Sequence, residues 1–278
     1  MMKSGRGIAA FLILLFLNVA LLPDLARAQS LWIPRDREGA VMFEALLPGV
    51  EFVQNEDFLT GAYFLDARYP VSSSVSVVGE LTYARLKGEY LIYVGSPEVS
   101  SKTFGNPYLG IEVGGTESPF FGEFGIRAPL MDENEPVAGL TGAYSDVGRW
   151  DAFAPFVVPV HAAVNLRQRL PSGVFHRLRA GTVLLVATDS QAETDLYGVY
   201  AFQIGYEGRD LRIGGAATGQ MLITDDTGNL GARSTNQLEL HADGGPWRVR
   251  PGIDVKLPLG GASSLISAVL GLSLSVGL

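Results

Sequence analysis

Apolar and polar residues alternate with a period of two along most of the chain. In FVVPVHAAVNLRQRL, every second residue from Phe156 to Leu166 is apolar, whereas His161, Asn165 and Arg167 lie at the positions between them. WRVRPGIDVKLPL repeats the pattern, and the final ISAVLGLSLSVGL alternates apolar residues with mostly Ser and Gly. A strand with this pattern has one apolar face and one polar face.

This alternation predicts a chain built almost entirely from β-strands. The C-terminal segment is expected to be the last strand, with its apolar positions, Ile266 included, on one face. The first strand contains Leu47-Pro48-Gly49, which could divide it into two pieces. The predicted strands, twelve in all, lie near residues 40–54, 59–70, 75–86, 105–115, 119–130, 156–170, 174–188, 196–207, 211–224, 235–243, 247–258 and 266–278.

The apolar faces could be buried in two ways, either against each other in a soluble sandwich or against lipid in a membrane barrel. Strand length favours the barrel, because several segments approach the 9–11 residues that cross a bilayer obliquely. The connections also differ in length. Alternate ones (VSSS, TESP, PSG, GRD and DGGP) are short, and the other set includes longer segments such as 131–155. The predicted fold is all-β: a single closed antiparallel transmembrane β-barrel of about 12 strands.

The N-terminal segment has the layout of a secretory signal peptide. Lys3 and Arg6 precede an apolar run from Ile8 to Leu22, and Ala26-Arg27-Ala28 ends the segment. We therefore expect a signal peptide at 1–28, an N-terminal periplasmic segment at 29–39 and a barrel at 40–278. This organisation predicts export to the bacterial outer membrane and contact with its lipid, with insertion by the barrel-assembly machinery. The assembly signal usually ends in an aromatic residue, whereas this chain ends in Leu278.

Composition narrows the function classes. The chain carries 21 Lys and Arg against 29 Asp and Glu, for a formal net charge of −8. Since it also has no basic cluster, it lacks the charge that neutralises phosphates in nucleic-acid binding. Cysteine is absent, so disulfides and thiolate metal sites are excluded. We expect no nucleic-acid partner, no metal and no cofactor.

In a barrel, the polar positions of the strands line the interior. Tight pairing of their charges would give a plugged network, and segregation on separate walls would give a narrow charged pore. The predicted lumen-lining residues are Glu80, Glu112, Glu123, Arg127, His161, Arg167, Arg177, Arg179, Arg212, Glu239, His241, Arg248, Arg250, Asp254 and Lys256.

Catalytic groups are sparse in this sequence. His241 and Asp243 share a strand face, which resembles half of an acid–base pair, but the predicted topology places them at the periplasmic end. Asp225 and Asp226 lie at the outer rim in ITDDTGN, which lacks the ligand spacing of a calcium loop and is better read as a solvated turn. Segment 131–155 is the richest candidate for a lid or constriction, because loops of this length are often functional. No catalytic residue is predicted.

Three segments carry a resemblance to a known group of proteins. FGNPYLGIEVGG, FFGEFGIRAPL and RVRPGIDVKLPL resemble strands of small bacterial outer-membrane barrels, notably the meta-pathway phenol-degradation transporter-like group. The resemblance covers about a third of the chain after the signal peptide. It implies a barrel of roughly twelve strands and the passage of small molecules, and it carries over no functional residue.

The predicted function is that of a passive channel or transporter for small molecules. An outer-membrane enzyme acting on lipid or peptide, a structural or adhesion barrel without transport, and a soluble exported sandwich are the alternatives.

Overall fold

The computed structural model describes residues 31–33, 39–51, 53–54, 57–90, 98–114, 118–190, 192–224, 233–245, 248–260 and 266–278. The predicted signal peptide and the Asp225-Asp226 pair lie outside these residues. Within the described part of the chain, no helix has the length and apolar character needed to span a membrane.

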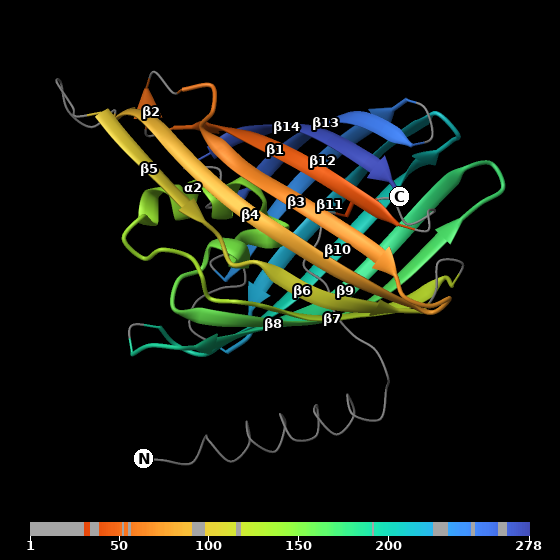
Figure 1. Cartoon of the computed structure of the whole chain (residues 1–278), viewed down its shortest axis with the longest axis horizontal. Coiled ribbons are helices and arrows are strands. Elements are labelled where there is room, and N and C mark those ends of the chain that lie inside the picture. The colour runs from red at the N-terminus through yellow and green to blue at the C-terminus, as the bar shows by residue number, and fades with distance from the viewer. Residues whose placement is uncertain are drawn as a thin grey trace, which may run out of the picture.

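Twelve strands form one closed antiparallel sheet (Figure 1). Each strand pairs with the next along the ring, β14 pairs with β1, and β4 closes the ring by pairing with β6. The short strands β2 and β5 extend the outer half of β4. The strands are β1 (Ala40–Val50), β2 (Val53–Gln54), β3 (Gly61–Pro70), β4 (Val75–Tyr90), β5 (Glu98–Phe104), β6 (Tyr108–Val113), β7 (Phe120–Arg127), β8 (Val157–Arg169), β9 (Val174–Ala187), β10 (Asp195–Glu207), β11 (Leu211–Leu222), β12 (Ser234–Gly244), β13 (Val249–Leu259) and β14 (Ile266–Gly277). The predicted closed barrel of about twelve strands is confirmed, and the two-sheet sandwich is excluded.

Side chains alternate between the interior and the outside of the ring. Along β14, Leu270, Leu272 and Leu274 point outward with 43–50% of their surface exposed, and Ser273 and Ser275, at the alternate positions, are buried. Large exposed apolar side chains occur in the same way on strands all around the ring. Soluble monomers rarely expose contiguous apolar surface of this extent, so lipid is the environment that covers it.

A bulge changes the alternation at the start of β14. The β1–β14 register shifts between Pro48, opposite Val269, and Val50, opposite Ile266. The extra residue rotates the strand, so Ile266 turns inward and is 2% exposed. The expected outward position of Ile266 was therefore wrong, because period two holds only while the register is unbroken.

The two ends of the barrel differ. The short connections 71–74, 170–173 and 208–210 lie at the end where β1 begins and β14 stops. The longer connections lie at the other end, on the left in Figure 1, where helix α2 (Pro136–Ser145) and the 3-10 helix η1 (Val147–Phe153) fold into the ring. We call these the short-turn end and the long-loop end. In outer-membrane barrels the short turns face the periplasm.

Candidate functional site in the barrel lumen

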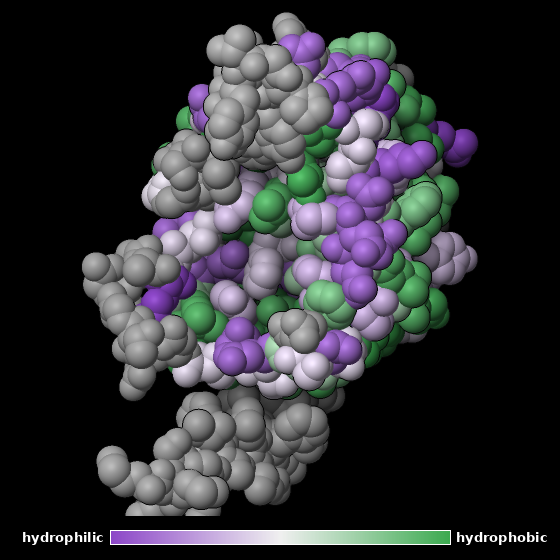
Figure 2. All heavy atoms as spheres, turned by 90° about the vertical axis from the view of Figure 1, so that its left-hand side faces the viewer, coloured by the Kyte–Doolittle hydropathy of each residue, from purple (hydrophilic) through white to green (hydrophobic). Residues whose placement is uncertain are grey.

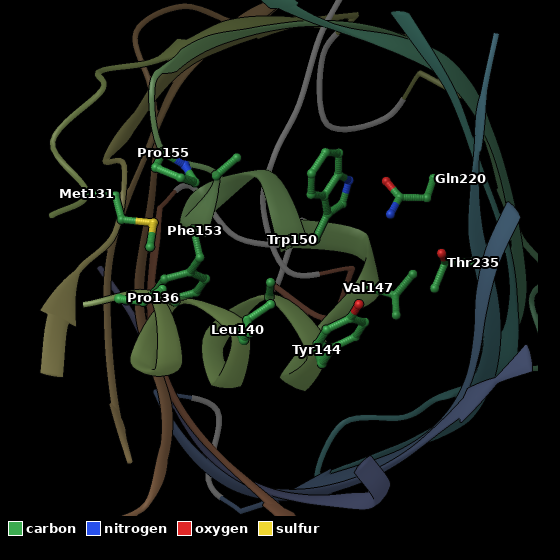
Figure 3. Close-up of a pocket in the computed structure, with 13 residues that line it drawn as sticks. Met131, Pro136, Leu140, Tyr144, Val147, Trp150, Phe153, Pro155, Gln220 and Thr235 are labelled. Atoms are coloured by element: carbon green, nitrogen blue, oxygen red, sulfur yellow. The ribbon is translucent and has the colours of Figure 1, made fainter. Parts of the chain in front are cut away.

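Segment 131–155, predicted as a lid or constriction, lies inside the barrel and crosses the lumen (Figure 3). Helix α2 packs against β3, β4 and β5 on one wall, and η1 contacts β11 and β12 on the other. The helix approaches its neighbours closely because its buried face consists of small residues: Ala138, Gly139, Thr141, Gly142 and Ser145. Gly142 lies directly against the Phe153 ring, where a side chain would leave no room.

Asn106 holds both ends of this segment. Its Oδ1 accepts hydrogen bonds from the backbone N–H groups of Leu130 and Met131, each at 2.9 Å. Its Nδ2 donates to the carbonyl oxygens of Asp151 at 3.3 Å and Ala154 at 2.7 Å. The side chain is fully buried, so all four bonds are shielded from water. Asn106 belongs to the Gly-Asn-Pro-Tyr motif that carried the sequence resemblance, and the structure gives that motif a physical role.

Arg149 ties η1 to the wall formed by β1, β3 and β4. Its guanidinium lies 2.7 Å from Glu44, 3.3 Å from Asp66 and 3.2 Å from Glu80, and its Cζ lies 3.7 Å from the centre of the Phe64 ring. All these side chains are buried. If the Arg149 guanidinium left this position, three buried carboxylates would lose the charge that compensates them, which is strongly unfavourable. This contact therefore fixes the segment in place.

Asp146 links the segment to a further strand of the barrel, β13. Its Oδ2 lies 2.6 Å from Lys256 Nζ on β13 and 2.8 Å from a terminal nitrogen of Arg149. Burial opposes ionisation of Asp146, but the charges of Lys256 and Arg149 outweigh it and hold the pKa of this carboxyl well below its usual value. Ionised groups therefore hold the segment to β13 as well as to β1, β3 and β4.

Asp151 makes a second ionic anchor within η1. It accepts from Arg127 Nε at 2.7 Å and lies 2.8 Å from His161 Nε2. Burial again opposes ionisation, and the neighbouring Arg127 charge lowers the pKa of Asp151 well below its usual value. In this arrangement His161 contacts a buried carboxylate through Nε2, and its ring lies edge-on to the Tyr108 ring.

Most predicted lumen-lining residues have side chains that the barrel buries wholly or largely. Arg248 is the exception, because it precedes β13 and is exposed at the short-turn end. The buried ones are Glu80, Glu112, Glu123, Arg127, His161, Arg167, Arg177, Arg179, Arg212, Glu239, His241, Arg250, Asp254 and Lys256.

These charges pair between strands that are neighbours or lie two apart on the ring. Arg68 contacts Glu112 at 2.8 Å, and Arg127 contacts Glu80 at 2.7 Å. On the other side, Glu123 lies 3.0 Å from Arg177. Of the two arrangements left open by the sequence, the structure has the paired network, which fills much of the interior.

Near the short-turn end, three residues of the N-terminal segment lie inside the barrel. Trp32 is fully buried and stacks on His241 with ring centres 4.4 Å apart, and its Nε1 donates to Glu239 at 2.6 Å. The carbonyl oxygen of Leu31 accepts from Arg177 and Gln203. The sequence placed 29–39 in the periplasm as a whole, whereas residues 31–33 occupy the lumen.

His241 is enclosed by carboxylates. Its Nδ1 lies 2.5 Å from Asp254 and its Nε2 lies 2.8 Å from Asp243, which Arg212 also contacts. Both ring nitrogens are thus engaged, and the ring face is covered by Trp32. The pair that resembled half of an acid–base site is part of this buried network.

Glu44 and Trp32 are among the members of the lumen that sequence reasoning missed. Glu44 lies between Met42 and Leu46 on the inward face of β1. Because these two inward residues are apolar, the alternation did not indicate that Glu44 points into the lumen. Trp32 belongs to no predicted strand. The only signal for it was an isolated aromatic residue shortly after the predicted cleavage site.

Three cavities lie in line along the wall formed by β8 to β13. The outer one, of about 430 Å³, lies at the long-loop end between segment 131–155 and the residues Gln220 and Thr235. A middle cavity of about 30 Å³ shares Val147 and Gln220 with it. An inner cavity of about 10 Å³ shares Leu31 with the middle one. The two small cavities have room for about one or two water molecules each, so the path is constricted at η1 and at residues 31–33.

The arrangement defines a class of protein. A closed antiparallel ring with an apolar outer surface, a charged interior and a loop folded into the lumen has the architecture of bacterial outer-membrane channels. The described residues contain no group of three or more His, Asp or Glu placed to hold a metal ion.

Comparison with solved structures agrees with this class. The COG4313 outer membrane channel from Pseudomonas putida F1 aligns with a TM-score of 0.58 at 7% identity, covering 90% of this chain and 99% of that one. The NanC porin aligns with a TM-score of 0.53 at 7% identity, covering 86% and 100%. No family model and no curated protein matches the sequence. At this identity, the likeness establishes the fold.

Proposed function

We propose that this protein is an outer-membrane channel for small molecules, with its path narrowed by segment 131–155 and by residues 31–33. The observation that carries the proposal is the series of three cavities along one side of the lumen, in which neighbouring cavities share lining residues and mark out a path. A purely structural barrel needs no such path.

The division of the lumen into two halves supports the same function. Beside β1, β3 and β4 the interior is filled by α2 and by the ion pairs of Arg149 and Arg127. Beside β9, β10 and β11 the wall carries small side chains such as Ala201 and Thr218 as well as charged ones such as Arg179, and the middle cavity lies there. The filled half holds the segment rigidly, and the other half leaves the route for a solute.

As a finer proposal, this channel passes the same kind of solute as the meta-pathway phenol-degradation transporter-like group. Its support is the Gly-Asn-Pro-Tyr motif, in which Asn106 anchors segment 131–155. Gly105 is needed in the same motif because a Cβ there would lie 2.2 Å from Thr82 Oγ1 and 2.5 Å from the Ala152 carbonyl oxygen. The motif thus builds the constriction.

Conductance in planar lipid bilayers tests the channel. The refolded protein, with folding verified by heat-modifiable migration on gels, is expected to give small discrete current steps, and a variant with the N-terminal constriction removed, Trp32→Ala, is expected to give larger ones. If both proteins fold and neither conducts, the channel proposal is refuted.

A further inference from the structure

The outer cavity differs in chemistry from the rest of the lumen. Its lining is almost entirely carbon, none of the described residues that line it is charged, and the barrel wall contributes the polar residues Gln220 and Thr235. Its volume of about 430 Å³ lies within the usual range of small-molecule sites, about 300–1,000 Å³. Figure 2 looks onto the long-loop end, where hydrophobic residues lie in the hollow and hydrophilic residues lie on the rim.

Segment 131–155 has two faces of opposite character. Its buried charged groups, Arg149 and Asp151 among them, contact the barrel wall. Leu140, Tyr144 and Trp150 point into the cavity instead (Figure 3). Leu140 is 49% exposed there. The ionic anchors hold the segment in place, so Leu140 is not needed for that purpose. An apolar face turned toward the route of a solute is suited to bind one.

Gln220 supplies an unused polar group at the bottom of this cavity. The side chain is 8% exposed and projects toward Trp150 (Figure 3). Its Oε1 is buried and has no hydrogen-bond partner in the described part of the chain. A buried acceptor without a partner is costly, which a ligand carrying a hydroxyl group would relieve. A hydroxyl suits this amide because it can both donate and accept.

We propose that the outer cavity is a binding site for a compact, uncharged solute with an apolar body and a hydroxyl group. This inference rests on the proposed channel function, which makes the cavity the first stop on the path. The apolar body lies against Leu140, Tyr144 and Trp150, and the hydroxyl group meets Gln220. A carboxylate or ammonium of the same size would enter a site without a counter-charge and lose its hydration, so charged analogues bind far more weakly.

Quenching of tryptophan fluorescence by a brominated alcohol tests this site. 2,2,2-Tribromoethanol is uncharged, compact and apolar, has one hydroxyl group, and quenches tryptophan on contact. Tribromoacetate is the charged control with the same body. In the refolded protein, we expect tribromoethanol to give a saturable quenching component and tribromoacetate to give only the linear, collisional one.

Two pairs of proteins locate the effect. Trp150→Phe keeps the apolar wall and leaves two of the three tryptophans as reporters, so the saturable component should disappear. Leu140→Asp places a charge in the cavity, and we expect it to weaken binding by about tenfold or more. Leu140→Met, the matched control, should bind as the original protein does. Because Leu140 is half exposed, both changes leave the barrel core intact.

The outcomes separate this inference from the channel proposal. Saturable quenching that persists in Trp150→Phe, or that tribromoacetate produces equally, overturns the binding site even if the protein conducts. Loss of binding in Leu140→Asp, with binding kept in Leu140→Met and heat-modifiable migration kept in both variants, supports the site. If no protein conducts but the saturable, Trp150-dependent quenching remains, the channel proposal fails and the binding site stands.

Discussion

Trp32 holds the N-terminal segment in the lumen, and its removal should open the short-turn end. The indole is fully buried, packs with Ile33, Met42 and Phe175, and stacks on His241. Replacing a buried aromatic residue by alanine costs about 3–5 kcal/mol. Docking of residues 31–33 also has to overcome the ordering of three backbone residues, about 3–6 kcal/mol. Trp32→Ala therefore removes a stabilising free energy comparable to the whole entropic cost of ordering residues 31–33.

The expected change in docking is large. At 1.4 kcal/mol for each factor of ten, a loss of 3–5 kcal/mol weakens docking by roughly 100- to 3,000-fold. The inner and middle cavities, both lined by Leu31, would then merge. We expect the unit conductance in planar bilayers to rise in Trp32→Ala, and the N-terminal segment to become accessible to added protease.

Trp32→Phe is the matched control for this experiment. It keeps a ring to stack on His241 and loses the hydrogen bond to Glu239, so its conductance should stay nearer that of the original protein. Equal conductance of Trp32→Ala and the original protein, with both shown to be folded, would refute the assignment of residues 31–33 as a constriction.

Three further predictions concern the lumen and the lipid face. Asn106→Ala removes four buried hydrogen bonds that hold segment 131–155, so we expect noisier and larger currents, whereas the same change at the exposed Asn134 should leave them unchanged. The pKa of Asp146 is lowered in the folded chain, so its ion pairs contribute their full stabilisation of the segment above about pH 4, the usual aspartate value, and lose it as the pH falls. Conductance should therefore rise on acidification. A conductance that stays constant down to pH 2 would contradict this. Leu272→Arg places a cation on the outward face of β14 and should lower the free energy of unfolding in lipid vesicles by about 2–4 kcal/mol, whereas Phe58→Arg in an exposed turn should change it by less than about 0.5 kcal/mol; equal effects would argue against lipid contact at Leu272.

The strand pattern was readable because lipid imposes it residue by residue. Each outward position must be apolar, and each inward position of a narrow barrel must fit a polar interior, so alternation alone predicted the strands and the direction of side chains such as Arg177 and Lys256. The prediction was wrong at Ile266, where a bulge shifts the register, and Glu44 was overlooked between apolar neighbours on β1. The position of Ile266 depends on its pairing with the partner strand β1, and the role of Glu44 depends on its contact with the distant Arg149.

The candidate site was less readable, because its contacts join residues far apart in the chain. Segment 131–155 stood out by its length and charges, yet nothing in its sequence shows that Asp146 meets Lys256, 110 residues away, or that Asn106 holds both of its ends. Nor does the sequence near Trp32 show that the indole reaches Glu239, 207 residues further on.

The sequence by itself determined the closed barrel, its lipid-facing surface and the charged character of its interior, because these follow from a local period of two. Only the tertiary structure decided that the charges pair into a network, that segment 131–155 and residues 31–33 narrow the lumen, and that an apolar cavity lies at the long-loop end. Each of these depends on which groups meet inside the ring, and closing the ring is what brings them together.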